Sequence, residues 1–108
     1  MVKTQDRLTE MKAEILTAIA HPNRIKILEY LQKGVYCNCE LAPSIGLEQS
    51  NLSRHLKILT QAGILRSWKE GLKVNFKVAD PKVFKILEYA ESLAMTEVES
   101  TLELLEQV

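Results

Sequence analysis

Apolar residues recur every three or four positions in the first third of the chain, a spacing that predicts helices. One helix is expected from Thr4 to Ala20 and a second from Pro22 to about Gln32. Pro22 suits the start of a helix because its ring presets φ and no N–H is needed there. The chain is therefore expected to open with two consecutive helices.

Pro43 indicates where a short third helix begins. Proline clashes with the carbonyl group four residues before it, so it is comfortable only in the first turn of a helix. The third helix is therefore expected to begin at Cys39 or Glu40 and to end at Gly46.

A fourth helix follows after a tight turn. It is expected to begin at Gln49 or Ser50, with Ser50 as its N-cap, and to end at Ala62 before Gly63. Two short helices joined by such a turn form a helix-turn-helix unit, here over residues 39–62.

Apolar and polar residues then alternate. Residues 64–69 and 73–78 show this pattern, so a β-hairpin is expected over 64–78, with basic side chains on its solvent face and near its tip. Asp80-Pro81 caps a final helix that is expected to run to Glu106. The predicted fold is mainly α with a small β-hairpin wing, a winged helix-turn-helix in the order α-α-α-α-β-β-α.

The length of 108 residues and the apolar fraction of 46% predict a single globular domain, residues 1–108. A domain this small buries limited apolar surface alone, so pairing with a second copy would stabilise it. We recognise no signal peptide or membrane span, and therefore expect a cytoplasmic protein without a membrane partner. No phosphate-binding loop, activated nucleophile or paired carboxylates are recognisable either, so we do not expect an enzyme.

The net charge is zero, but the charges are unevenly distributed. Residues 49–78 carry six Lys or Arg and one acidic residue, whereas residues 79–108 carry two Lys and seven acidic residues. A neutral chain can present a basic face to phosphates in this way. The distribution favours nucleic-acid binding through the fourth helix and the hairpin.

The fourth helix has two distinct faces when its residues are placed at 100° intervals. Leu52, Leu56 and Leu59 form one face, which would anchor the helix in the core. The opposite face and its flanks are polar and cationic, which predicts a recognition helix that binds double-stranded operator DNA. The residues of this helix expected at the DNA are Gln49, Ser50, Asn51, Ser53, Arg54, His55, Lys57 and Gln61. Of these, His55 flanks the leucine face, where it either packs or contacts a phosphate.

The hairpin supplies three further candidate DNA contacts, Arg66, Lys69 and Lys73. Glu70 near the tip is unfavourable beside DNA, so the tip itself is expected to point aside. A winged helix used only for protein contacts is the alternative. A steep loss of affinity with salt would distinguish DNA binding from it.

Three segments resemble the ArsR/SmtB family of metalloregulatory repressors. Residues 20–28 (AHPNRIKIL) resemble its opening motif, and residues 49–59 (QSNLSRHLKIL), with AGIL after them at 62–65, resemble its recognition helix. Residues 37–41 (CNCEL) are similar to the Cys-x-Cys-Asp-Leu metal box of its arsenic, cadmium and lead sensors. The resemblance implies a repressor that leaves its operator when a metal or metalloid binds.

The same resemblance implies a homodimer that forms through the first and last helices, here residues 1–20 and 80–108. These two helices carry surplus apolar surface.

Cys37 and Cys39 are the candidate ligands for the inducing ion, since thiolates prefer soft ions. Cys39 is expected at the start of the third helix, where backbone N–H groups and the helix dipole favour its thiolate. The chain departs from the family pattern because it has no third cysteine and no histidine in residues 79–108 for the family's zinc site.

These ligands favour a metalloid. Two thiolates and a solvent oxygen suffice for As(III) or Sb(III), whereas tetrahedral zinc or cadmium would also need His21 and His55. As(III) or Sb(III) is therefore the expected inducer, with another soft ion as the alternative, and no cofactor is required for DNA binding.

Two other interpretations of the cysteine pair remain open. The pair can be a redox sensor whose thiol oxidation is the signal, or two ordinary small residues at a helix entry. A disulfide between residues i and i+2 is expected to be strained, which counts against a simple internal switch.

Overall fold

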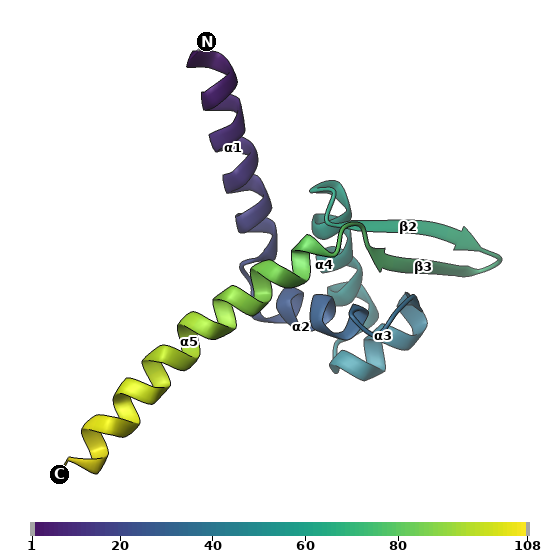
Figure 1. Ribbon diagram of the computed structural model, residues 1–108. Helices are drawn as coiled ribbons and strands as arrows, with labels where there is room; N and C mark the ends of the chain where they lie inside the picture. The colour runs from purple at the N-terminus through teal and green to yellow at the C-terminus, as the bar shows by residue number, and fades with distance from the viewer. Residues whose placement is uncertain (1, 108) are drawn as a thin grey trace.

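The computed structural model describes residues 2–107, over which five helices and three strands are found (Figure 1). In chain order they are α1 (Val2–Ile19), α2 (Pro22–Leu31), β1 (Tyr36–Cys37), α3 (Asn38–Ile45), α4 (Gln49–Gln61), β2 (Leu65–Glu70), β3 (Lys73–Val78) and α5 (Lys82–Glu106). Every helix and both hairpin strands expected from the sequence are present. The predicted fold, mainly α with a β-hairpin wing, is confirmed.

Strand β1 was not predicted. It pairs antiparallel with β3, which also pairs with β2, so the sheet has the order β1-β3-β2. The register sets Tyr36 opposite Phe76 and Cys37 opposite Asn75. Two residues are too few to show the alternation that identifies a strand in a sequence. This short strand joins the cysteine segment to the wing.

The starts of α3 and α4 differ from their expected positions. Helix α3 begins at Asn38 with Cys37 as its N-cap, so Pro43 lies in the second turn rather than the first. At α4, Glu48 and not Ser50 occupies the N-cap position, and no side chain caps the first turn. Ser50 therefore lies within the helix, on its exposed surface.

The core lies between α2, α3, α4 and the sheet. Its fully buried side chains include Leu28 of α2, Leu41 of α3, and Leu52 and Leu59 of α4. The leucine face predicted for α4 is therefore the face that packs inward. Burial of this face determines which side of α4 is turned to solvent.

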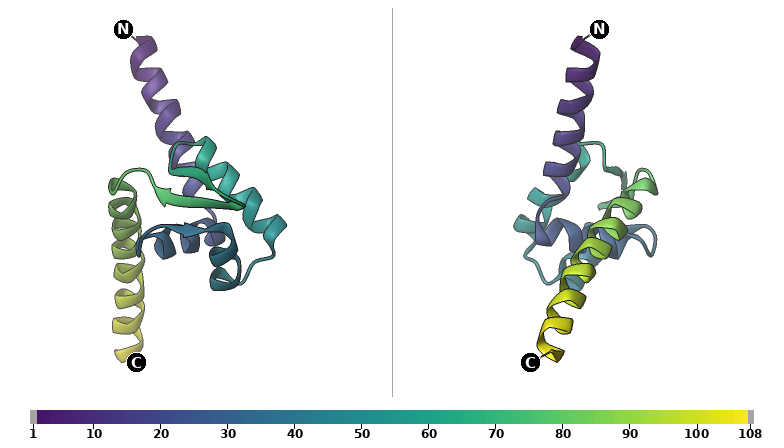
Figure 2. Two further views of the ribbon diagram at one scale, coloured as in Figure 1. Left: turned by 90° about the vertical axis from the view of Figure 1, so that its right-hand side faces the viewer. Right: turned by 60° about the vertical axis from the view of Figure 1, so that its left-hand side comes forward.

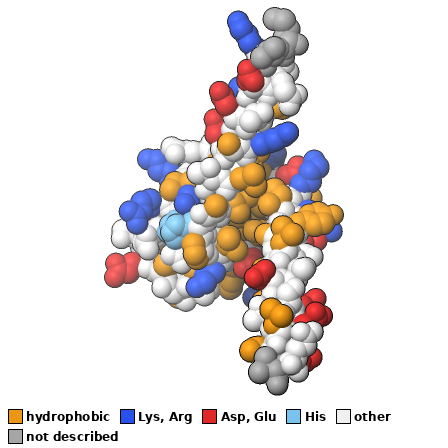
Figure 3. All heavy atoms as spheres, turned by 90° about the vertical axis from the view of Figure 1, so that its left-hand side faces the viewer, with side chains coloured by type: hydrophobic (Ala, Val, Ile, Leu, Met, Phe, Trp, Pro, Cys, Tyr) orange, Lys and Arg blue, Asp and Glu red, His pale blue; other side chains and the backbone are white. Residues whose placement is uncertain are grey.

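Helices α1 and α5 leave the core in different directions (Figures 1 and 2). The radius of gyration is 17.1 Å, whereas a compact domain of this length has a value of about 13 Å. Hydrophobic side chains gather over the region between the two helices (Figure 3). Those exposed along α1 and α5 are Leu8, Met11, Ile15, Leu16, Tyr89, Leu93, Met95, Val98, Leu102, Leu104 and Leu105.

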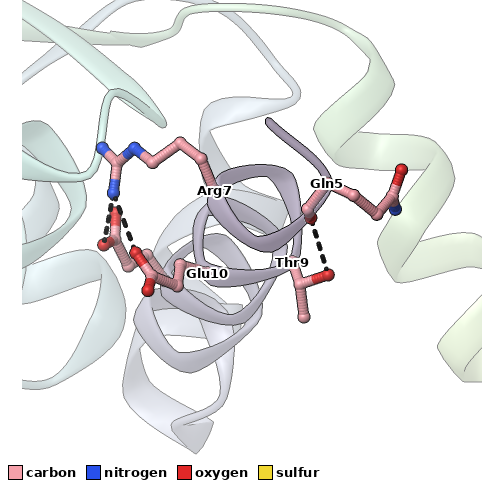
Figure 4. A network of polar contacts seen from close by, with 5 residues as sticks. Gln5, Arg7, Thr9 and Glu10 are labelled. Atoms are coloured by element: carbon pink, nitrogen blue, oxygen red, sulfur yellow. Dashed lines mark hydrogen bonds and ion pairs between the residues drawn. The ribbon is translucent and has the colours of Figure 1, made fainter. Parts of the chain in front are cut away.

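Another side of α1 carries charged groups. Arg7 Nη1 lies 3.4 Å from Glu10 Oε2 and 3.7 Å from Glu14 Oε1, and the Thr9 hydroxyl donates to the Gln5 carbonyl at 3.0 Å (Figure 4). These contacts are exposed and lie within one helix, so each contributes little stability. Helix α1 is thus amphipathic, and its apolar side is open to solvent.

None of the helices described between residues 2 and 107 is long and apolar enough to cross a membrane.

Candidate functional site

The exposed side of α4 carries the polar residues expected there. Ser50, Arg54, Lys57 and Gln61 are all exposed. Arg54 Nη2 donates a hydrogen bond to Asn51 Oδ1 at 2.7 Å, which holds the guanidinium beside the first turns of the helix. This surface combines hydrogen-bonding groups with two cations, as contacts to base edges and phosphates require.

The other candidates on α4 differ in exposure. Gln49 and Ser53 are exposed, and Asn51 is half-buried. His55 alone lies on the inner side of the helix: it is 5% exposed, and its ring centroid lies 4.5 Å from that of His21, the N-cap of α2. The buried position is incompatible with the expected DNA contact, because the side chain follows the leucine face inward. Packing, the other role considered for His55, is the one observed.

The wing places its cations on two faces. Arg66 and Lys73 lie on one face, with Lys73 directly opposite Glu70. Lys69 lies on the other face, because it follows Arg66 by three positions in β2, and side chains an odd number of residues apart in a strand point to opposite faces of the sheet. All three cations are exposed and Lys69 and Lys73 lie near the tip, as expected, although the three do not share one face of the hairpin. The Glu70 carboxylate accepts a hydrogen bond from the side-chain amide of Asn75, a buried residue of β3.

The surroundings of His55 disfavour its charged form. Burial lowers its pKa below the ordinary value of 6.5, and the nearby His21, Arg24 and Arg54 lower it further. Among residues 2–107, no group forms a hydrogen bond with its Nδ1. The folded protein therefore holds His55 neutral at a pH where the unfolded chain has begun to bind a proton.

We expect the stability of the fold to depend on pH through His55. Because the unfolded chain binds the proton at higher pH, the free energy of unfolding should fall as the pH drops through 6.5 towards the lowered pKa. Above that window the group should have no effect. Urea denaturation between about pH 5 and pH 8 tests this. His55→Gln should show a shallower pH dependence than wild type, and equal slopes would contradict the prediction.

Cys37 and Cys39 lie where β1 meets α3, and the structure joins their sulfur atoms in a disulfide. Their Cα atoms are 5.2 Å apart, within the ordinary range for disulfides. Cys37 is extended (φ −82°, ψ 163°) and Cys39 is in the first turn of α3, so the change of direction between them brings the side chains together. The disulfide that the two-residue spacing counted against is thus present in the structure.

The two cysteines have different surroundings. Cys37 is 1% exposed, and its Sγ accepts a hydrogen bond from the N–H of Glu40 at 3.2 Å. Its own N–H donates to Glu40 Oε1 at 3.0 Å, which completes a capping box. Cys39 is exposed. Cys39 thus lies in the first turn of α3, as expected, but the sulfur that accepts a hydrogen bond from an N–H group of that turn is that of Cys37.

The chain offers two sulfur ligands at this position. Within the described part of the chain, no three His, Cys, Asp or Glu side chains are grouped closely enough to hold a metal ion. His21 and His55 contact each other instead of completing a four-ligand site with the cysteines. The reduced pair therefore fits an ion that accepts two thiolates and fits tetrahedral zinc poorly.

The sequence did not predict the structural roles of two residues. His21 caps α2, with its Nδ1 accepting a hydrogen bond from the N–H of Asn23 at 3.1 Å. Asn38 contacts both α4 and β3. The only feature of the sequence that draws attention to Asn38 is its place between two cysteines. That place gives no indication of its contacts with Gln49 and Val74.

Comparison with known proteins agrees with this architecture. Residues 21–67 match the family described as bacterial regulatory protein, arsR family. The uncharacterised HTH-type transcriptional regulator Rv0081 of Mycobacterium tuberculosis is 37% identical over 87 residues, which are 80% of this chain and 76% of the relative. Its crystal structure has a TM-score of 0.78 at 32% identity and covers 88% of this chain and 96% of that one.

Two further proteins are similar to the chain. A probable mercury resistance operon repressor of Streptomyces lividans is 30% identical over 82 residues, 76% of this chain and 66% of the relative. The solution structure of a homodimeric winged helix-turn-helix DNA-binding domain, Mb0332 of Mycobacterium bovis, has a TM-score of 0.75 over 83% of each chain. Its sequence identity of 22% shows a likeness of fold.

The predicted family resemblance is therefore confirmed by the matched segment, which spans the helix-turn-helix and the start of the wing, and by relatives that cover most of the chain. This chain belongs to the arsR family of bacterial regulatory proteins and is a winged helix-turn-helix transcription regulator, not an enzyme.

Proposed function

We propose that the protein is a repressor that binds operator DNA with α4 and the wing. The observation that carries this proposal is the row of exposed polar and cationic side chains on α4, opposite a buried leucine face. N-terminal residues of a recognition helix contact base edges, and cations contact phosphates. The proposed contacts are Gln49, Ser50, Asn51, Ser53, Arg54, Lys57, Gln61, Arg66, Lys69 and Lys73.

Salt dependence of operator binding tests this assignment. Lys57→Ala should reduce the slope of log affinity against log salt by about 0.9, because one phosphate contact is lost. Arg54→Ala should lower affinity by about 1–3 kcal/mol if the guanidinium contacts a base, with a smaller change in slope. Lys85→Ala removes an exposed cation of α5 and serves as the control. Equal effects of all three substitutions would contradict the proposed interface.

The protein is further proposed to act as a homodimer through α1 and α5. Their exposed apolar side chains, together with the extended shape, indicate a surface that a second copy would cover. The homodimeric state of the similar Mb0332 domain supports this. A two-fold dimer would present two α4 helices to two half-sites of the operator.

The proposed inducer is a soft ion held by Cys37 and Cys39, with As(III) or Sb(III) first. In the cytoplasm, where we place the protein, thiols are kept reduced, and the pair then supplies two thiolates. Such ligands select soft ions. The mercury resistance repressor among the relatives supports an ion of this class.

Oxidation of the pair is the second candidate signal, and the Cys37–Cys39 disulfide favours it. The two thiols would lose two electrons and two protons to a hydroperoxide as the sulfur–sulfur bond forms. Hydrogen peroxide would thereby be reduced to two molecules of water. The exposed Cys39 is accessible to such an oxidant, and the buried Cys37 lies within bonding reach.

Titration of the reduced protein separates the two signals. With arsenite, thiolate-to-metalloid absorbance should rise and operator affinity should fall. With hydrogen peroxide, loss of titratable thiols and a fall in affinity would instead identify the redox signal. Unchanged operator affinity under both treatments would refute regulation through this pair.

A further inference from the structure

Asn38 connects the cysteine pair to both elements that are proposed to bind DNA. It is the first residue of α3 and stands between Cys37 and Cys39 in the chain. Its backbone carbonyl accepts a hydrogen bond from Gln49 Nε2, at the first residue of α4, at 3.4 Å. Its side-chain Oδ1 accepts one from the backbone N–H of Val74, in β3, at 3.5 Å. Asn38 thus contacts α4 through its backbone carbonyl and the wing through its half-buried side chain.

The sheet register ties the same segment to the wing a second time. Cys37 lies opposite Asn75 of β3, and Asn75 lies opposite Trp68 of β2. These three residues form one row across the sheet, with their side chains on the same face. The amide of Asn75 in turn donates to Glu70 near the wing tip. A change in backbone direction at Cys37 would therefore act directly on the strands of the wing.

Asn38 lies between two residues whose sulfur atoms are bonded to each other. Cys37 Sγ caps α3 through the N–H of Glu40, and in the disulfide the same atom is bonded to Cys39. Breaking that bond, or using both sulfurs as ligands, requires the side chains of the two neighbours of Asn38 to change position. The peptide units between them include both peptide bonds of Asn38. If this backbone shifts with them, the contacts of Asn38 to Gln49 and Val74 shift too, because its carbonyl and side chain move with the backbone.

The space between α4 and the wing allows such a response. A solvent-open groove of about 300 Å³ lies between the two elements, and Asn38 is part of its wall. Lys57 and Gln61 of α4 and Phe76 of β3 line it as well. A close-packed core resists sub-ångström shifts, whereas the groove leaves room on this side for the wing to change its angle to α4.

We infer that Asn38 is the positioning residue through which the state of the Cys37–Cys39 pair reaches the wing. The inference rests on the proposed function, because it supposes that the pair regulates DNA binding. The signal would follow a specific route. The hydrogen bond from the N–H of Val74 to Asn38 Oδ1 differs between the two states of the cysteine pair, and this difference supplies the coupling free energy between the pair and DNA binding. If the signal instead tilted α3 as a rigid body, the Asn38 side chain would have no special part.

Three variants isolate this contact. Asn38→Ala removes the Oδ1 acceptor and is tolerated at the first position of a helix. Asn38→Asp keeps an acceptor oxygen and suits the positive end of the helix dipole. Ser44→Ala is the matched control, because Ser44 lies on the same helix and bonds only to Tyr30 and Glu40 among the described residues. For each reduced protein, we would measure arsenite affinity by thiolate absorbance and operator affinity with and without arsenite. Operator affinity would also be measured after peroxide oxidation.

Allosteric coupling is typically about 5–150-fold in affinity. We expect the wild type, Asn38→Asp and Ser44→Ala to show such a ratio between the two states of the pair. In Asn38→Ala the ratio should fall below about threefold, while arsenite affinity and thiol oxidation change less than about threefold. A residue with a merely structural role would lower DNA affinity in both states and leave the ratio intact.

Two results would overturn the inference in distinguishable ways. If Asn38→Ala retains the wild-type ratio, the route through Asn38 is wrong and the proposed regulation stands. If the wild type itself shows no difference in operator affinity under either treatment, the proposed regulation fails and the inference fails with it. Fluorescence of Trp68, the only tryptophan, provides a second readout, since it should change with the state of the pair in wild type and much less in Asn38→Ala.

Discussion

Replacement of Leu93 by glutamate is expected to convert the proposed dimer into monomers and to lower operator affinity by about 10²–10⁴-fold. Leu93 is 75% exposed in the single chain and lies on the apolar side of α5. A buried carboxylate in the dimer interface would lack a partner, which is costly. Each monomer would then bind one half-site alone and lose the gain that two linked contacts provide.

Sedimentation analysis and operator titration of the same samples test this prediction. Ser92→Glu adds the same charge one residue away, on the polar side of α5, and should leave the protein dimeric. Leu16→Glu on α1 should behave like Leu93→Glu, since Leu16 is 54% exposed on the other apolar helix. A Leu93→Glu variant that stays dimeric with wild-type affinity would contradict the assigned interface.

Elements with a long periodic pattern could be predicted from the sequence. The leucines of α4 recur over two turns, and burial of that face alone is enough to turn Arg54 and Lys57 outward. The expected polar row on the exposed side of α4 follows directly. The excess of Lys and Arg in residues 49–78 likewise predicted that α4 and the wing carry the basic surface of the chain.

Features that depend on distant partners could not be predicted. Strand β1 exists because β3 is beside it, and two residues carry no pattern of their own. The position of His55 depends on contact with His21, 34 positions earlier in the chain. The disulfide depends on the sharp turn from β1 into α3, and the start of α3 was misplaced because the expectation rested on Pro43. For β1 and His55 tertiary contacts outweighed a local rule, whereas at the start of α3 the local capping box between Cys37 and Glu40 did.

Replacement of Cys37 by serine is expected to abolish the response of operator binding to arsenite and to peroxide. Serine is a good N-cap, so its hydroxyl should take over the hydrogen bond from the N–H of Glu40 and preserve the start of α3. The variant should therefore fold and bind operator within about twofold of wild type. With one thiol left, neither a two-sulfur site nor an internal disulfide can form, and a coupling of about 5–150-fold should fall to unity.

Cys37→Ala separates the role of the cap from the role of the sulfur. Alanine removes the ligand and the cap together, so it should lose the response and also about 1 kcal/mol of stability, measured by urea denaturation. Cys39→Ser should lose the response at unchanged stability, because Cys39 is exposed and does not cap the helix. If Cys37→Ser retains an arsenite or peroxide response, the sensing thiols are not this pair. If Cys37→Ser loses operator binding as well, the side chain of Cys37 supports the DNA-binding form through packing. A hydroxyl and a thiol both cap the helix, but only the thiol suits a site that is 1% exposed.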